Sequence, residues 1–181
     1  KWGRIDFLVH AIAYSDKNEL NGRYVDTSKE NFLNTMEISC FSFTQILRIF
    51  EPLLTENSSV LTLTYGGSQR VIPNYNVMGV AKAALESSVR YLASDLGDKG
   101  IRVNALSAGM MRTLAGSVVK GARDMFKFAE KHKLLKYDLT LENIGSSGLY
   151  LLSDLSVGVT GEVHYVDQGY NTIGMPKIKD L

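Results

Sequence analysis

The chain has 181 residues, a formal net charge of +1, and a composition that is 45% hydrophobic and 22% charged. This length supports one domain with a substantial core, while the near-neutral charge argues against a strongly basic nucleic-acid surface. No apolar run approaches the ~20 residues of a membrane span, so we expect no membrane partner. The single cysteine, Cys40, has no internal disulfide partner, so we expect it to lie in the core of a cytoplasmic protein.

The first predicted element is an apolar run at residues 5–9, which is typical of a buried strand. It follows almost directly on the first residue, and no leading βαβ unit precedes it. We therefore expect residues 1–181 to be the C-terminal portion of one larger domain whose N-terminal part is missing from this chain. Residues 10–15 are mostly small, which suits either a tight turn or a flat ligand approaching the backbone at the strand end.

A long helix is predicted over about residues 28–50, with Thr27 and Glu30 as its capping box. Its apolar stripe has helical spacing and comprises Phe32, Met36, Cys40, Phe43, Leu47 and Phe50. Further apolar residues widen this stripe. We expect the sheet to cover one side of the helix and a partner subunit to cover another.

The next strand, residues 60–64, leads into a stretch with two tyrosines, Tyr65 and Tyr75, and then Lys82 on a helix predicted from about residue 75 to residue 97. Open α/β sheets place their chemistry where strands end and helices begin. Seven residues are almost two helical turns, so Tyr75 and Lys82 share a face but lie roughly 10 Å apart along the axis. A ribose hydroxyl could bridge them, and the lysine would bias the phenol towards releasing its proton. By itself, this spacing is more typical of an amphipathic face.

The rest of the chain continues the alternation of strands and helices. A strand is predicted at residues 101–106, a mixed and partly exposed helix at 114–133, a helix starting at Thr140, and a last strand at 161–166. This order predicts an α/β fold with a Rossmann-like, doubly wound parallel sheet. His10, His132 and His164 lack metal-ligand spacing, so we expect no metal site.

The run at residues 73–86, PNYNVMGVAKAALE, resembles the bacterial enoyl-acyl-carrier-protein reductases, a divergent branch of the short-chain dehydrogenases. Residues 102–109, 112–115, 153–156 and 161–167 resemble further segments of this family. Ordinary short-chain dehydrogenases use Tyr-x3-Lys, but Met78 stands four residues before Lys82. The Tyr-x6-Lys spacing of Tyr75 and Lys82 is the pattern of the enoyl reductases.

The resemblance implies hydride transfer from NADH to the 2,3-double bond of trans-2-enoyl-acyl-carrier-protein thioesters in fatty-acid elongation, by a homotetramer. Tyr75 would hydrogen-bond the thioester carbonyl, and Lys82 would hold the nicotinamide ribose. Tyr65 would lie against the substrate, either positioning the acyl chain or taking part in protonation. The alternatives are another short-chain reductase acting on a carbonyl or enone, and a non-catalytic nucleotide-binding fragment.

The family pattern also implies a lid at about residues 111–136, with Ser15 as a substrate contact. The residues that would contact NADH besides Lys82 are Ile12, Thr64, Met111, Arg112, Thr113, Leu114 and Ala115. The glycine-rich turn of the family's first strand is not in this chain, so we expect this chain alone to bind NADH poorly, and a separate N-terminal chain fragment could complete the cofactor site. The basic lid suits an acidic carrier protein or a solvated face. Asp167 suits a subunit contact or the cofactor wall.

Overall fold

The computed structural model describes residues 3–111, 113, 119–175 and 177. Its four described strands form one parallel sheet in the order β1 (Ile5–His10), β2 (Leu54–Thr64), β3 (Arg102–Ala108) and β4 (Val163–Val166). The register brings His10 beside Thr62, and Thr64 beside Ser107, so the carboxyl ends of the strands share one edge. The α/β Rossmann-like prediction is confirmed. Among the described strands the order follows the sequence without reversal.

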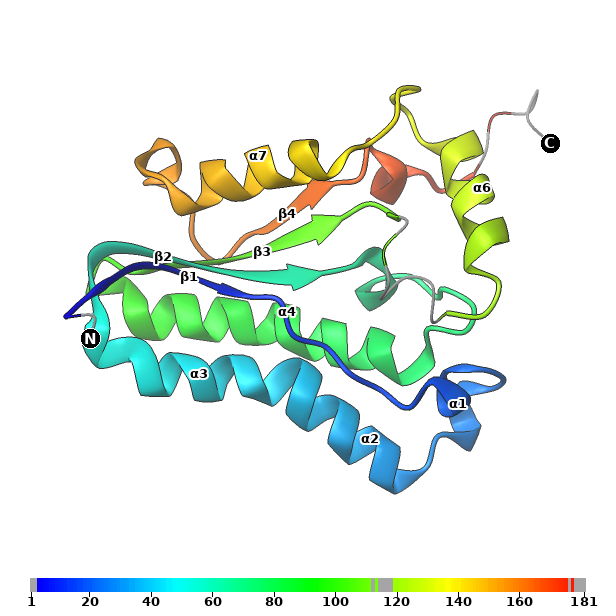
Figure 1. Ribbon diagram of the computed structural model, residues 1–181, viewed down its shortest axis with the longest axis horizontal. Coiled ribbons are helices and arrows are strands. Elements are labelled where there is room, and N and C mark those ends of the chain that lie inside the picture. The colour runs from blue at the N-terminus through cyan, green and yellow to red at the C-terminus, as the bar shows by residue number, and fades with distance from the viewer. Residues whose placement is uncertain (1–2, 112, 114–118, 176, 178–181) are drawn as a thin grey trace.

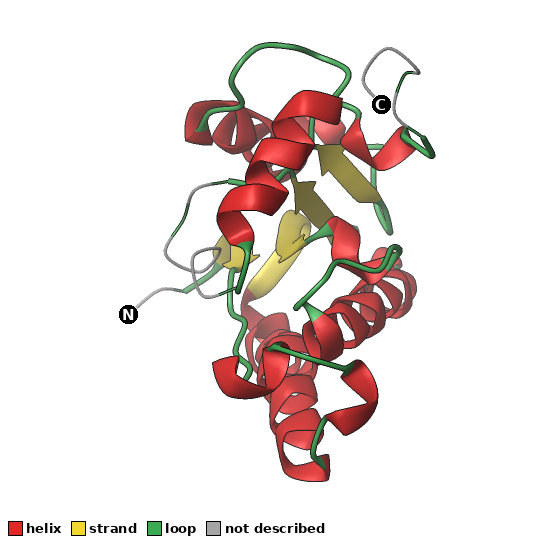
Figure 2. Cartoon of the chain, turned by 90° about the vertical axis from the view of Figure 1, so that its right-hand side faces the viewer, coloured by secondary structure: helices red, strands yellow, loops and turns green. Residues whose placement is uncertain are grey.

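Helices cover both faces of this sheet (Figure 1). One face carries α2 (Lys29–Met36), α3 (Ser42–Phe50) and α4 (Asn76–Gly97), and the other carries α7 (Leu141–Leu152). The short α1 (Lys17–Leu20) and the longer α6 (Ala122–His132) lie towards the edge where the strands end. Figure 2 faces that edge. The candidate site lies there, because the loops that follow parallel strands converge at one edge.

The core follows the alternation of side chains along the central strand β2. Val60 packs with Phe43, Leu47 and Leu85 on the face of α3 and α4, whereas Leu61 packs with Leu106 and Leu151 under α7. Cys40 is buried with the first group, as expected. The predicted stripe from Met36 to Phe50 therefore packs into the core under the sheet, whereas Phe32 packs against Leu20, Val77 and Met78 of α1 and α4. A π-helical turn at Glu37–Phe41 separates α2 from α3.

The predicted capping box was wrong at the start of this helix. Ser28, not Thr27, caps α2, because its hydroxyl accepts a hydrogen bond from the backbone N–H of Asn31. Thr27 instead donates its hydroxyl to Tyr24 O at 2.7 Å. Ahead of α2, the polar segment at residues 16–26 contains α1, with Asp16 as its cap.

The first strand is less covered than its apolar sequence predicts. Among the described strands β1 pairs with β2 alone, and its Phe7 and Val9 are 57% and 47% exposed. Ile5 and His10, at its two ends, are buried. An apolar run indicates a strand that can be buried on both faces, but the elements that would bury it are a tertiary property. Within the described ranges, no helix is long and apolar enough to cross a membrane.

Candidate active site at the carboxyl edge of the sheet

Two phenols meet where β2 gives way to α4. Tyr65 directly follows β2, and the short turn Gly66–Ser68 leads back towards Tyr75, which caps α4. The two rings lie edge to face, with centroids 5.2 Å apart and planes at 76°. This is a favourable geometry for aromatic pairs, because the positive edge of one ring meets the negative face of the other. The structure thus brings together two predicted site residues ten positions apart.

Glycines allow this close approach. A Cβ on Gly67 would lie 2.4 Å from Cδ1 of Tyr75, and a Cβ on Gly79 would lie 2.6 Å from the carbonyl oxygen of Gly67. Both distances are far inside van der Waals contact. The turn after β2 can therefore pack against the first turn of α4 only because these positions lack side chains, and that packing seats the Tyr75 ring.

Two asparagines hold the backbone on either side of Tyr75. Asn74 and Asn76 have φ values of 59° and 38°, in the left-handed region that asparagine tolerates better than most residues. The Asn76 amide donates to the carbonyl of Leu20 at 3.0 Å, beside α1. The Asn74 amide donates to the carbonyl of Lys120 at 2.9 Å, ahead of α6. Tyr75 is thereby tied to segments on both sides of the site.

Lys82 lies under the end of β2. Its side chain is buried, and Nζ donates to the carbonyl of Leu63 at 2.8 Å. Burial lowers the pKa of Lys82 to about 8, against the opposing effects of Cys40 and Glu86. Next to Leu63, the hydroxyl of Thr64 donates to the buried carboxylate of Glu86 at 2.6 Å. The end of β2 therefore connects two predicted cofactor residues, because Lys82 bonds to Leu63 and the next residue is Thr64.

Both phenols keep their protons at neutral pH. Burial, followed by the charges of Tyr170 and Asp167, raises the pKa of Tyr65 to about 12. Burial also raises the pKa of Tyr75, with smaller effects from Tyr65 and Glu86. We expected Lys82 to bias the Tyr75 phenol towards proton release, but in the described chain burial dominates and the ammonium is held by Leu63 O. Both hydroxyls are thus hydrogen-bond donors rather than phenolates.

His10 is a structural residue, as expected. It is only 2% exposed, with Nδ1 3.0 Å from Oγ1 of Thr62 and Nε2 2.9 Å from Oγ of Ser42. Ser42 donates its own proton to Ile38 O, so it accepts from Nε2–H of His10. Burial and the charge of Lys82 lower the pKa of His10 to about 4, so the ring is neutral. It clamps β1 to β2 and α3 just before the small-residue loop.

That loop places Ser15 and Ile12 in different environments. The Ser15 hydroxyl accepts from Thr35 at 2.9 Å and lies 3.3 Å from the Asn31 amide oxygen, so it is tied to α2. Ile12 is 45% exposed at the carboxyl end of β1. Ile12 could therefore contact a ligand at the strand edge, whereas the Ser15 hydroxyl is already hydrogen-bonded to α2.

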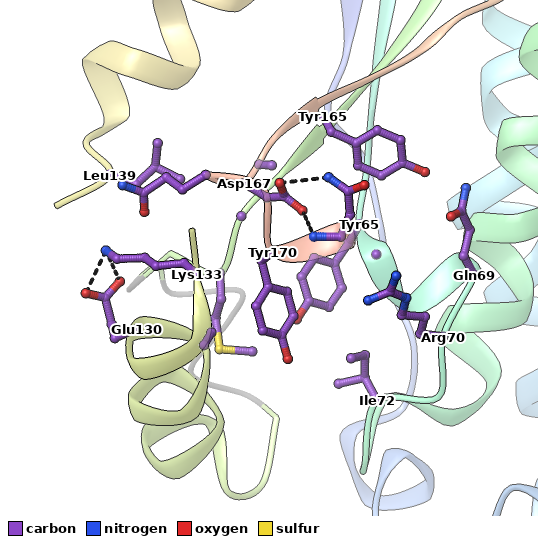
Figure 3. A pocket seen from close by; sticks show the side chains of 17 residues that line it. Tyr65, Gln69, Arg70, Ile72, Glu130, Lys133, Leu139, Tyr165, Asp167 and Tyr170 are labelled. Carbon is purple, nitrogen blue, oxygen red and sulfur yellow. Dashed lines mark hydrogen bonds and ion pairs between the residues drawn. The ribbon is translucent and has the colours of Figure 1, made fainter. Parts of the chain in front are cut away.

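A small pocket that opens to solvent adjoins Tyr65 (Figure 3). Tyr65 and Tyr170 lie side by side in it, with Arg70 on one side and the Lys133–Glu130 ion pair of α6 on the other. Neither Tyr75 nor Lys82 lines this pocket. Arg70 donates to Ile173 O at 2.7 Å. No local sequence motif marks Arg70 or Tyr170, so neither was predicted as a site residue.

Asp167 now has a definite structural role in the pocket wall. Its carboxylate accepts from the backbone N–H of Gly169 at 3.0 Å and of Asn171 at 2.8 Å, and so caps the turn after β4. Gly169 has a φ of 79°, which suits glycine. Asp167 is followed two residues later by a glycine, and this spacing is a turn signal that could have been read from the sequence.

Comparisons with known proteins show the family of this chain. A family profile described as Enoyl-(Acyl carrier protein) reductase matches residues 1–171. The chain belongs to this enoyl reductase family. It is 61% identical to "Enoyl-[acyl-carrier-protein] reductase [NADH] 2" of Rhizobium meliloti, covering all of this chain and 68% of that protein. It is 55% identical to "Enoyl-[acyl-carrier-protein] reductase [NADH] FabI" of Rickettsia typhi, covering 98% of this chain and 68% of that protein.

Solved structures of this enoyl reductase family have the same fold. FabI from Candidatus Liberibacter asiaticus is 56% identical, with a TM-score of 0.94 over 97% of this chain and 68% of its own. The reductase of Anaplasma phagocytophilum, solved in complex with NAD, is 52% identical, with a TM-score of 0.91 over 98% of this chain and 65% of its own. The present chain thus spans about two thirds of the length of these enoyl reductases.

The remaining predicted cofactor residues of this enoyl reductase chain follow β3 in the sequence. Arg112, Leu114 and Ala115 fall outside the described residues. Met111 lines a second hollow beneath α6, and the N–H of Thr113 donates to Met111 O at 2.9 Å. Among the described residues, no group of three or more His, Cys, Asp or Glu side chains could hold a metal ion.

Proposed function

We propose that this chain carries the catalytic residues of an NADH-dependent reductase of trans-2-enoyl-acyl-carrier-protein thioesters, acting in cytoplasmic fatty-acid elongation. The observation that carries the proposal is the edge-to-face pair of partly buried phenols, Tyr65 and Tyr75, at the carboxyl edge of a parallel sheet, the same edge at which Lys82 donates to Leu63 O. The relatives named as NADH-dependent enoyl reductases support it. Tyr75, Tyr65 and Lys82 would be its catalytic residues.

The donor set at the strand ends fits the nicotinamide ribose of NADH. An ammonium has three N–H donors, and Lys82 uses one for Leu63 O, which leaves donors for ribose hydroxyls. Ile12 offers an exposed apolar surface just after β1, and Thr64 is the last residue of the neighbouring strand β2. Met111, Arg112, Thr113, Leu114 and Ala115 would continue the cofactor contact. When bound, NADH supplies the hydride.

Tyr75 would stabilise the negative charge that develops on the thioester carbonyl oxygen during the reaction. Addition of hydride to C3 of the enoyl thioester moves electrons onto the carbonyl oxygen, and the Tyr75 hydroxyl donates a hydrogen bond to that oxygen. The raised pKa keeps the proton in place, so the donor is present at neutral pH. A single donor of this kind is worth roughly 10²–10³ in kcat. Tyr65 would support the Tyr75 ring and bound the substrate, with Ser15 ordering the neighbouring loop.

The test is NADH oxidation with crotonyl thioesters by the wild-type protein and by Tyr75→Phe. We expect the variant to lose roughly 10²–10³ in kcat with little change in the KM for NADH, because the ring remains and the donor is gone. Turnover of a 3-oxoacyl thioester without turnover of the crotonyl thioester would favour a carbonyl reductase of the same fold. Equal rates for both proteins would rule out this role of Tyr75.

The proposed partner is an acidic acyl carrier protein docking on α6, within a lid at residues 111–136. Lys127 and Lys131 lie four residues apart and are exposed, while Glu130 is neutralised by Lys133. Charge reversal at Lys127 and Lys131 should raise the KM for carrier-bound substrate and leave the KM for the coenzyme A analogue unchanged. Reversal of the exposed Arg48, on α3, is the matched control. A solvated face would respond equally to both reversals.

Two uncovered apolar surfaces support further assembly. Phe7 and Val9 share one exposed face of β1, whose outer edge pairs with no described strand, so this side suits a further parallel strand and a covering element, which we propose bind the adenosine half of NADH and belong to this polypeptide or to a separate N-terminal chain. Ile49 on α3 and Tyr91 on α4 are 62% and 74% exposed, which suits the helix contacts of a homotetramer. Light scattering of Tyr91→Glu beside wild type tests the tetramer, since a mass that does not change would argue against this contact.

A further inference from the structure

We propose that Asn74 is a positioning residue that couples the docking of α6 to the orientation of the Tyr75 phenol. The inference rests on the reaction proposed above and adds to it a physical link between α6 and the hydrogen-bond donor. Its basis is the hydrogen bond from the Asn74 amide to the carbonyl of Lys120, which joins residues 46 positions apart. Lys120 stands two residues before the start of α6.

The helix α6 depends on contacts at its ends. None of its residues is buried, so its own face contributes little packing. At its C-terminal end, Lys133 binds Glu130 and Tyr137 O, and the N–H of Leu134 donates to Gln168 O at 3.0 Å. At its N-terminal end, a hydrogen bond from Asn74 links the described segment before α6 to the turn that carries Tyr75. An element with few buried contacts opens readily, so the loss of one end contact should shift it towards the undocked state.

The same asparagine also sets the backbone conformation directly before Tyr75. Its φ of 59° and the hydrogen bond from Tyr75 N to Ile72 O at 3.2 Å close a turn directly before the helix. Tyr75 therefore follows any movement of Asn74 through a single peptide bond. Its ring has little freedom to compensate, because Gly67 and Tyr65 contact it closely on the other side.

Asn76 provides an internal comparison. It also has a left-handed backbone, it adjoins Tyr75 on the other side, and its amide donates to Leu20 O and Gly22 O rather than to the segment before α6. Glycine adopts the left-handed region freely, so Asn74→Gly and Asn76→Gly each remove one amide donor without adding backbone strain. The two variants differ in which segment they release.

The first measurement is the rate at which trypsin cleaves after Arg123 and Lys127, which are exposed on α6, in the intact protein. Fragments are identified by mass, and cleavage after Arg48 on α3 serves as the internal reference. We expect Asn74→Gly to be cleaved about fivefold faster within α6, the factor that corresponds to one net hydrogen bond. Asn76→Gly should be cleaved at the wild-type rate.

The second measurement is a double-mutant cycle with Tyr75→Phe, followed by kcat for the crotonyl thioester. If α6 docking orients the phenol, the loss caused by Tyr75→Phe should be about fivefold smaller in the Asn74→Gly background than in wild type. Equal cleavage of the two glycine variants, or additive losses in the cycle, would overturn the coupling. A wild-type protein that does not reduce crotonyl thioesters would overturn the proposed function instead, while the cleavage comparison would still decide the link between Asn74 and α6.

Discussion

The contact between Gly67 and Tyr75 can be tested by adding one methyl group. In Gly67→Ala the new Cβ would lie 2.4 Å from Cδ1 and 2.7 Å from Cε1 of Tyr75, whereas ordinary van der Waals contact begins at 3.4 Å. The ring must therefore retreat by about 1 Å, or the turn must move by as much. The neighbouring Gly66 offers a matched control, because a Cβ there has no atom within 4 Å.

The expected consequence is a loss of turnover larger than the loss of stability. Displacement of a catalytic group by about 1 Å costs about 10²-fold in rate, so kcat of Gly67→Ala should fall by about that factor. Overpacking of this kind destabilises proteins by about 1–3 kcal/mol, which leaves the protein folded at moderate temperature. The KM for NADH should change little, because Lys82 is bonded to β2 rather than to this turn.

The assay is NADH oxidation with a crotonyl thioester, together with thermal unfolding of Gly67→Ala, Gly66→Ala and wild type. Gly66→Ala should keep kcat within about twofold of wild type, because a surface substitution away from close contacts is usually within about 0.5 kcal/mol. A wild-type kcat in Gly67→Ala would refute the reasoning that this turn seats the phenol. Equal losses in both variants would refute the assignment of the effect to the Tyr75 contact.

Three further predictions concern buried polar groups at the same edge. Lys82→Met should raise the KM for NADH, and in wild type that KM should rise as pH increases through about 8, where Lys82 loses its proton. Burial lowers the folded-state pKa of His10 from 6.5 to about 4, so the free energy of unfolding should decrease by up to about 3 kcal/mol as pH falls from 6.5 towards 4. Urea unfolding at these two pH values should show this decrease in wild type but not in His10→Gln. Thr64→Val removes the donor to buried Glu86 and should cost about 1–3 kcal/mol of unfolding free energy, with Thr55→Val on the exposed part of β2 as control.

The periodic elements could be predicted from the sequence because their signals are local. The capping pair Thr140 and Asn143 is present as a complete capping box at the start of α7. The helix predicted from about residue 75 begins at Asn76 and ends at Gly97, as expected. The shift of the α2 cap from Thr27 to Ser28 shows the limit of such signals. Only Thr27 has a glutamate three residues later, yet Ser28 is the cap, because the Thr27 hydroxyl donates to Tyr24 O instead.

The exposure of β1 could not be predicted in this way. Phe7 and Val9 belong to an apolar run that is typical of a strand covered on both faces. Periodicity reports what a strand is suited to contact, and not which elements lie within reach of it. The same limit applies to the pocket beside Tyr65, since Arg70 and Tyr170 come from separate loops and meet only in the folded chain.

The spacing of Tyr75 and Lys82 suggested the proposed chemistry, but the spacing alone does not position the two groups. Lys82 is held by Leu63 O on β2, and the ring of Tyr75 packs against Gly67 and Tyr65. These contacts come from the strand end and its turn rather than from the helix that follows. Asn74 and Asn76 add hydrogen bonds on either side of Tyr75. In this chain the orientation of the proposed donor therefore depends on the glycine turn and the flanking asparagines as well as on the seven-residue spacing.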